Sequence, residues 1–312
     1  MLAISRAWNR FWFQPISTSS ISVFRIFFGI LSGLSASFYL EDCQIWFGLD
    51  GPLPPETVSR HSPALLGDLI LSLHWGSEVC LALLWIKILA CLAVTLGMYT
   101  RTSLFILWLA DILLYLRNPL FWHHGDTLLR VYGTVLLFCP AGEMYSVDSW
   151  RRRRDNPEQK PRYFAPWGQR LIQAKLSIVY VEAFFGKIVA PRWLDGSAVY
   201  YATHFPDGNR HPIPAWMDHL WVYHALTGST LLIEFSLMAL IWFRPLRYVV
   251  LAMGVLFHLG IHWFLHLDLL EFAAILGFIA FIYPEDMESF VNGISQRFKT
   301  QGAASSKEKA EP

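Results

Sequence analysis

The sequence is poor in charge and in cysteine. Lys, Arg, Asp and Glu make up 16% of its 312 residues, whereas a typical soluble domain carries about 25%. The four cysteines fall at long spacings without a CxxC pair, so the sequence shows neither a zinc-binding motif nor a thioredoxin-type motif. A net charge of +1 provides no global field that would attract nucleic acid. We therefore expect neither a disulfide-stapled mini-domain nor a nucleic-acid partner.

Apolar and aromatic residues, in contrast, are abundant. Hydrophobic residues make up 54% of the chain, which includes 14 Trp and 23 Phe, and the mean hydropathy is +0.37. This is more aromatic side chain than one soluble core of this length needs. The composition excludes a disordered or collagen-like chain and indicates a polytopic membrane protein.

Eight segments are candidate membrane-spanning helices, since a span needs about 20 mostly apolar residues. They are residues 20–40, 79–99, 102–117, 126–139, 171–190, 220–243, 246–264 and 267–283. The fourth segment is short. Residues 64–75 are too short and too amphipathic to span, and we expect them to lie along the membrane interface. The prediction is an all-α, polytopic integral membrane helical bundle with about eight transmembrane helices.

Loop charge favours an N-in, C-in orientation. With the N-terminus inside, sixteen of the 25 Lys and Arg residues would lie inside and only four outside, namely Arg60, Arg117, Arg192 and Arg210. The RRRRD run in the loop 140–170 fits this topology signal better than the alternative, a clamp for anionic lipid. We expect a cytoplasmic N-terminal segment over 1–19, uncleaved because no cleavage site follows it. A membrane domain over 20–285 and a polar cytoplasmic tail over 286–312, disordered from 297, complete the chain.

Charged residues inside the predicted spans need an explanation, because each costs at least ~2.5 kcal/mol at mid-bilayer. They persist where they form ion pairs or perform chemistry, and Arg25, Asp111 and Glu234 fit buried pairs well. The full set is Arg25, Lys87, Asp111, Arg130, Lys175, Glu182, Lys187 and Glu234.

Lys187 stands out in this set because it follows Gly186 near the outer end of the fifth span. Burial disfavours a charged amine, and a neutral amine is a general base or a nucleophile. The alternative is a lysine that snorkels to the interface.

Histidines form a second group at the outer side of the predicted bundle. His258, His262 and His266 recur every four residues, so they would share one helix face, while His123 and His124 precede the fourth span beside Asp126. Such a face could relay protons or line a polar cavity, and no metal site is predicted since HLGIH lacks the Glu of HExxH. The residues that map to the outer half of the bundle suggest a pocket open to the outer side; they are Lys187, Trp193, Asp195, His123, His124, Asp126, His258 and His262.

The cysteines leave one alternative open. Cys43 lies in the first outer loop and Cys80 at the outer end of the second span, so the two could form a disulfide in an oxidising exterior. Free, packed thiols are the other reading, which we also expect for Cys91 and Cys139.

Four stretches resemble a known family in the family's order. FRIFFGIL opens the first span; NPLFWHHGDTLLR leads to LLFCPAGEMYSVDSW; QAKLSIVYVEAFFGKIVAPRWLDGSAVYY surrounds Lys187; and IEFSLMAL and VLFHLGIH follow. Together they resemble the HTTM (horizontally transferred transmembrane) domain family, related to the membrane part of vitamin K-dependent gamma-glutamyl carboxylase. The chain looks like the membrane core alone.

The resemblance implies roles for particular residues. In the carboxylase the matching lysine deprotonates reduced vitamin K, an oxygenated intermediate then takes a proton from a substrate glutamate, and carbon dioxide adds. It thus implies Lys187 as the base, with Asp126, His124 and His258 as further catalytic residues. The residues implied to bind the cofactor, reduced vitamin K or menaquinone, are Trp193, His123 and His262.

Two functions follow as expectations. The first is a carboxylase-like enzyme, of the lyase or oxidoreductase type, that uses a reduced quinone. The alternative is a non-catalytic membrane factor for maturation or export of a secreted peptide. A transporter fits less well, since no inverted repeat is visible. The expected partners are membrane lipids, a quinone and an exported peptide or protein substrate, and the expected location is a bacterial inner membrane.

Overall fold

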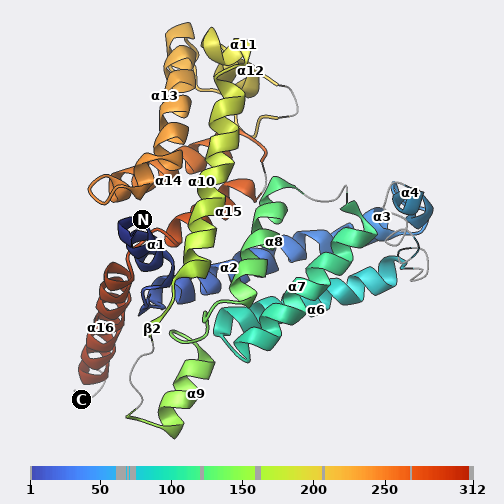
Figure 1. The fold of residues 1–312 in the computed structure, drawn as a ribbon. Helices are drawn as coiled ribbons and strands as arrows, with labels where there is room; N and C mark the ends of the chain where they lie inside the picture. The colour runs from blue at the N-terminus through green and yellow to red at the C-terminus, as the bar shows by residue number, and fades with distance from the viewer. Residues whose placement is uncertain are drawn as a thin grey trace.

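The computed structural model describes residues 2–60, 68, 70, 75–119, 123–158, 163–205, 208–267 and 269–308. Most of these residues are helical (Figure 1), which confirms the all-α class. The one sheet in these ranges has two strands, β1 (Ile16–Ser17) and β2 (Tyr163–Phe164), which pair antiparallel. It joins the segments that precede two long helices, α2 and α10.

Each of the eight expected spans contains a helix at the expected place. They are α2 (Ser19–Glu41), α6 (Ser77–Leu96), α7 (Thr100–Arg117), α8 (His124–Leu137), α10 (Trp167–Lys187), α13 (Leu220–Met238), α14 (Arg247–Phe264) and α15 (Leu270–Ile279), with the short 3-10 helix η2 (Leu240–Trp242) after α13. By length and composition α2, α6 and α14 could each cross a membrane, and α15 is a shorter apolar helix. The eight-span count and the orientation stay predictions.

Seven further helices are shorter or lie outside the predicted spans. They are α1 (Leu2–Phe13), α3 (Cys43–Phe47), α4 (Pro55–Arg60), α9 (Val147–Asp155), α11 (Pro191–Leu194), α12 (Ala198–Thr203) and α16 (Pro284–Glu308). The expectation of a disordered tail from 297 is wrong, since α16 continues to Glu308. Its second half is rich in Ala, Gln, Lys and Glu, which favour helix, and has no proline. The expected interfacial segment 64–75 lies mostly outside the described residues.

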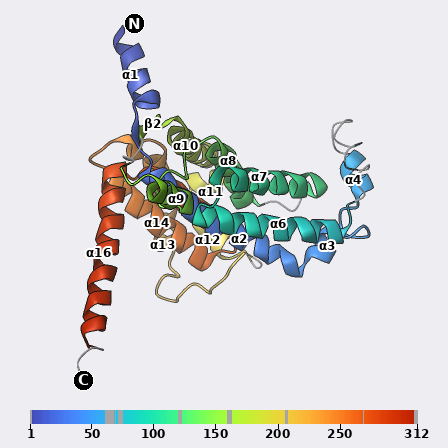
Figure 2. The same cartoon turned by 90° about the horizontal axis from the view of Figure 1, so that it is seen from below.

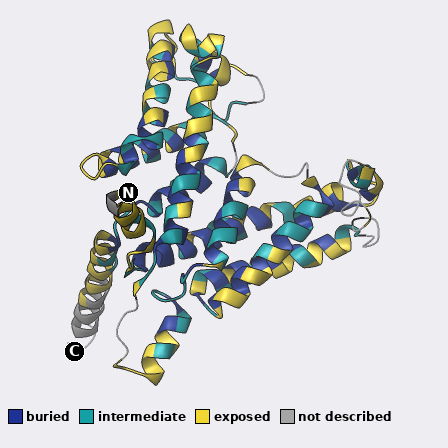
Figure 3. Ribbon diagram, in the orientation of Figure 1, coloured by how far each residue is buried: buried dark blue, intermediate teal, exposed yellow. Residues whose placement is uncertain are grey.

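The long helices form two arms that meet at α15 (Figure 1). One arm holds α2, α6, α7 and α8, and the other holds α10 and α13 with α11 and α12 at its far end. Contacts of α15 with α8, α2, α10 and α14 join the arms. Buried residues concentrate where the arms meet, while the outer faces of α6, α7 and α13 are exposed (Figure 3).

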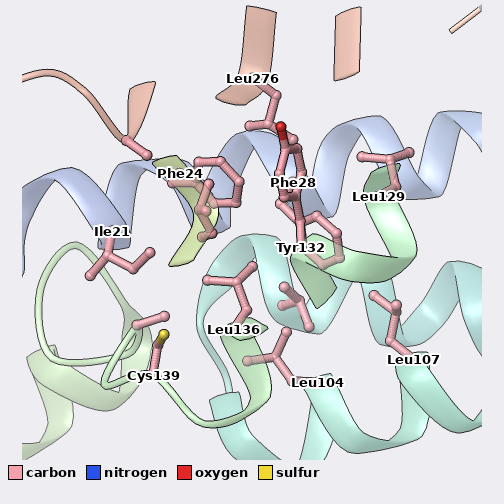
Figure 4. Close-up of a cluster of buried hydrophobic side chains, with 14 of the residues drawn as sticks. Ile21, Phe24, Phe28, Leu104, Leu107, Leu129, Tyr132, Leu136, Cys139 and Leu276 are labelled. Atoms are coloured by element: carbon pink, nitrogen blue, oxygen red, sulfur yellow. The ribbon is translucent and has the colours of Figure 1, made fainter. Parts of the chain in front are cut away.

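The main hydrophobic core fills the junction. Phe24 and Phe28 of α2 pack with Tyr132 and Leu136 of α8 (Figure 4), and the Phe24 and Tyr132 rings meet edge to face with centroids 5.2 Å apart. Gly133 leaves room for the Phe28 ring, because a Cβ there would lie 3.0 Å from it. The small residue thus lets α8 approach α2 closely.

A buried three-membered ion cluster ties α6, α7 and α8 together. The Lys87 ammonium lies 2.6 Å from one Asp111 carboxylate oxygen, and the Arg130 guanidinium lies 3.0 Å from the other. The expectation that Asp111 is a buried pair partner is confirmed. One carboxylate between two cations fixes the register of three helices at once.

Three buried arginines instead satisfy backbone carbonyls. The Arg25 guanidinium donates to the carbonyls of Ala141 and Tyr145, so the expectation that Arg25 forms an ion pair is wrong. The reason is that the loop after α8 folds back and presents its carbonyls to the start of α2. Arg117 binds four carbonyls of the segment 47–75, and Arg247 binds those of Ile241 and Trp242.

Asp148 stabilises the tight turn between α6 and α7 from another segment. Its carboxylate accepts hydrogen bonds from the backbone amides of Tyr99 and Thr100 and from the Thr100 hydroxyl, at 2.7 to 2.9 Å. These amides open α7, where helices leave amides unsatisfied. Partial burial raises the pKa of Asp148, but the hydrogen bonds from Thr100 and Tyr99 outweigh burial and hold the pKa below its usual value.

Asp111→Ala should lower the free energy of unfolding by about 3–5 kcal/mol, since it leaves two buried cations without their shared partner. Thermal melting of the purified protein in detergent measures the loss. Asp155→Ala, which removes an exposed carboxylate at the end of α9, is the control and should melt like the wild type. Equal melting of both variants would contradict the structural role of the cluster.

Asp148→Ala should cost about 1 kcal/mol of stability at neutral pH, the usual cost of a lost helix cap. A lowered pKa in the folded state means that the carboxylate stabilises the fold above the unfolded pKa. That contribution begins to weaken as pH falls below the unfolded pKa of an aspartate, about 4, and it is lost as pH falls through the lower folded pKa. The gap in melting temperature between wild type and variant should therefore close on acidification. A gap independent of pH would show that the carboxylate charge is not what matters.

Candidate functional site

A cavity of about 640 Å³ opens where the two arms diverge. His123 and Asp126 reach it from the start of α8, His262 from the end of α14, and Arg210 from the segment after α12. Its remaining lining is mainly apolar and aromatic: Leu34, Phe38, Tyr39, Asp42, Trp46, Leu269 and Phe272. The structure thus brings together His123, Asp126 and His262, three of the residues predicted to share an outer pocket.

Asp126 is held rigidly at the floor of this cavity. Its two carboxylate oxygens accept hydrogen bonds from the Ser35 hydroxyl at 2.6 Å and the Tyr39 hydroxyl at 2.8 Å. The preceding Gly125 lies against the backbone of α15, since a Cβ there would be 2.8 Å from the Leu270 nitrogen. The HHGD stretch therefore needs its glycine so that α8 can begin beside α15.

His262 and Arg210 form the opposite wall. The Arg210 guanidinium lies 3.1 Å from Nε2 of His262, and the His262 ring meets the Phe272 ring edge to face. Within the described part of the chain, Nδ1 of His262 and Nε of Arg210 are buried without a hydrogen-bond partner. Such atoms are costly unless a water or a ligand satisfies them, so this wall is suited to a polar ligand group.

The third histidine of the predicted face is elsewhere. Helix α14 ends at Phe264, and the chain then pairs with the segment before Arg210, through an Asn209–Leu265 bridge and a His266 amide donating to the Gly208 carbonyl. His266 therefore does not continue the helix face of His258 and His262, and that expectation is wrong. The same pairing positions Arg210 beside His262.

Lys187 occupies a second centre at the end of α10. Its Nζ lies 2.5 Å from Oε1 of Glu234 on α13 and 5.2 Å from the ring centroid of Trp193. The Glu234 side chain is 5% exposed and that of Lys187 is 27% exposed, while Oε2 of Glu234 has no hydrogen-bond partner among the described residues. Lys187 and Trp193 lie side by side, but neither lines the cavity.

His258 belongs to a third, fully internal group. Its Nε2 lies 2.6 Å from the Tyr180 hydroxyl, and its Nδ1 contacts the Glu271 carboxylate in a short hydrogen bond. A carboxylate, an imidazole and a phenol in series can hold or pass a proton. His258 also interacts electrostatically with Glu234, which links this group to the Lys187 centre.

The remaining predicted site features are not part of these three groups. His124 is exposed at the start of α8 and does not line the cavity. Among the residues that the structure describes, no three His, Cys, Asp or Glu side chains gather as a metal site would require. Cys43 and Cys80 are both buried free thiols, so the alternative of a disulfide between them is not realised here.

Sequence reasoning missed several residues of these centres. Glu271 is a charge inside the eighth predicted span, so the rule that singled out Glu234 could have found it. Arg210 was counted only as a loop charge, and nothing local distinguishes Tyr39, Trp46 or Tyr180 from ordinary core aromatics. Only the tertiary structure brings these side chains to the cavity and to His258.

Together the apolar helices and these buried polar centres define a helical membrane protein. The profile of the HTTM domain matches residues 69–285, well over half of the chain, and the protein therefore belongs to the HTTM domain family, which is related to the gamma-carboxylase. No curated protein and no solved structure matches the chain.

Gly125→Ala should destabilise the protein by about 1–3 kcal/mol, because the added methyl group collides with the backbone at Leu269 and Leu270 and forces α8 and α15 apart. Gly228→Ala on α13 is the matched control: its Cβ meets nothing within 4 Å, so it should be neutral or stabilising by up to about 1 kcal/mol. Melting of the two variants in the same detergent measures the contrast. Equal effects would disprove the close approach at Gly125.

Proposed function

We propose that this protein is a carboxylase-like membrane enzyme that acts with a reduced quinone-type lipid and uses Lys187 as its base. The observation that carries the proposal is the Lys187–Glu234 pair, a partly exposed amine 2.5 Å from a buried carboxylate inside the helical bundle. Membership in the carboxylase-related family supports it. The bacterial inner membrane, with the cavity toward the outer side, is the location that we propose.

The surroundings of Lys187 fit a quinone ring. The Phe184 ring contacts those of Phe185 and Phe235, with centroids 5.4 and 5.7 Å apart, and Trp193 lies beside the amine. Flat aromatic surfaces next to a single polar group suit a ring that carries hydroxyls. Phe184, Phe235 and Trp193 would hold the ring of reduced vitamin K or menaquinone. Such a lipid, when bound, would supply the reaction with oxygen that drives the family's carboxylation.

The pair also explains how Lys187 can act as a base in a membrane. An ammonium beside a carboxylate and an amine beside a carboxylic acid have the same net charge. Moving the proton from Nζ of Lys187 to Oε1 of Glu234 therefore creates no new charge in a medium that penalises charge heavily. The neutral amine can then accept a proton at Nζ, as a general base does. His258, Tyr180 and Glu271 would keep the carboxylate of Glu234 in a fixed electrostatic environment.

The cavity would bind the second substrate. Arg210 and His262 offer buried nitrogen atoms to a polar or acidic group, and the aromatic lining suits the apolar part of a peptide. His123 would orient that group from the opposite side. We infer a segment of an exported peptide or protein as the occupant.

The alternative is a non-catalytic membrane factor that binds an exported peptide and supports its maturation. One observation favours it: Lys187 is not among the residues that line the cavity. Such a factor needs the cavity lining and has no need of a base. The two functions therefore differ in whether the Lys187 centre binds a ligand.

Quinone binding to the purified protein in nanodiscs tests the choice. We expect reduced menaquinone to bind saturably to the wild type and to lose affinity at least ~10-fold in Lys187→Ala, with His262→Ala retaining affinity because it alters only the cavity. Oxygen-dependent turnover should accompany binding. If the folded wild-type protein did not bind reduced menaquinone, the proposal of an enzyme would be wrong and the peptide-binding factor would remain.

Lys187→Arg should lower the rate of oxygen-dependent quinone turnover by ~10²-fold or more, while the melting temperature stays close to that of the wild type. Arginine keeps the positive charge and can still pair with Glu234, but it does not release its proton. Lys175→Arg, on the same helix, makes the same chemical change away from the site and should retain full activity. Normal turnover in Lys187→Arg would exclude Lys187 as the base.

A further inference from the structure

Helix α1 is strongly two-sided. Its sequence, LAISRAWNRFWF, has no acidic residue. Ile4, Trp8 and Trp12 recur every four residues and therefore share one face of the helix, which also carries Phe11. Arg6 and Arg10, again four residues apart, lie on the opposite face, which carries one aromatic residue, Phe13, at the end of the helix.

The last turn of α1 contacts the bundle through Phe11. The Arg170 guanidinium of α10 donates to the Phe11 carbonyl and lies 4.7 Å from the centroid of the Phe11 ring, which in turn lies 5.9 Å from the ring of Trp242. The preceding residues project away from these contacts. Ile4 is 77% exposed and Trp8 59% exposed.

The direction of α1 indicates which medium its exposed apolar surface contacts. In Figure 2, α1 and α16 leave the same end of the bundle and run across the line of α6 and α7, while α3 and α4 lie at the other end. Phe11 turns toward the bundle, so Ile4 and Trp8, on the same helix face, turn to that side as well. Beyond the edge of the bundle, the medium on that side of a membrane protein is lipid.

We propose that α1 lies in the headgroup region of an anionic membrane leaflet, with Ile4 and Trp8 inserted and the arginine face toward the phosphates. An apolar face with Trp opposite a basic face is typical of helices that lie in the interface plane. Basic residues near the surface are attracted by anionic lipid. The helix would thereby anchor the N-terminal end of α2 at a fixed depth, whatever the reaction at Lys187.

Site-directed fluorescence on the full-length protein tests this. A single cysteine in Ile4→Cys or, as the matched control on the polar side, in Asn9→Cys carries an environment-sensitive dye, since the four native thiols are buried. The unsubstituted chain measures background labelling. The labelled proteins are reconstituted into vesicles of phosphatidylcholine alone or mixed with phosphatidylglycerol, each with a lipid-borne quencher at headgroup depth.

We expect quenching at position 4 to exceed that at position 9 by about twofold or more in the anionic vesicles. Replacing both Arg6 and Arg10 by Gln should abolish the extra quenching that phosphatidylglycerol produces. Equal quenching at both positions, or none at position 4, would overturn the proposal. So would disulfide formation between the position-4 cysteines of two molecules of the unlabelled Ile4→Cys protein, which would assign the face to a second copy of the chain.

Discussion

Buried charge and buried carbonyls must be satisfied inside this protein, because a membrane offers no water to do so. The structure meets the requirement with arginines that bind backbone carbonyls. Arg25 and Arg247 cover the carbonyls at one end of the bundle, and Arg117 covers those of the segment 47–75. Between these ends, Asp111 compensates Lys87 and Arg130 at mid-helix. The irregular connections can enter the bundle because these arginine side chains donate hydrogen bonds to their backbone carbonyls.

The same requirement separates structural polar groups from functional ones. Asp111 uses both of its oxygens on protein partners, whereas Glu234 uses one oxygen on Lys187 and leaves the other without a partner in the described structure. Arg210 and His262 each have one buried nitrogen atom without a hydrogen-bond partner in the described structure. Other buried polar atoms of the described residues, among them Nε of Arg25 and the Tyr132 hydroxyl, also lack a partner, but they lie within the packed core. Those of Glu234, Arg210 and His262 lie at the Lys187 centre and at the cavity, where a ligand or a proton could reach them.

Much of the fold could be predicted from the sequence, because long apolar runs identify helices independently of their neighbours. All eight expected segments contain helices, and charge within a span identified Asp111 and Glu234 as paired residues. The partner of Arg25 could not be predicted, since it depends on how the loop at 141–145 folds back. Nor could the departure of His266 from the helix, which a backbone pairing with Gly208 imposes. Composition alone also underestimated the helix-forming tendency of the tail.

The site was predictable only in part, for a related reason. Spacing can place Lys187, His123 and His262 on the same side of the bundle, but distance across that side depends on the angle between the two arms. The arms diverge at α15, and this separates a cavity near α8 from an amine centre near α13. In a bundle of parallel helices, the cavity and the amine centre would lie together. In the enzyme that we propose, the divergence would hold the lipid ring and the peptide at separate positions, the Lys187 centre and the cavity.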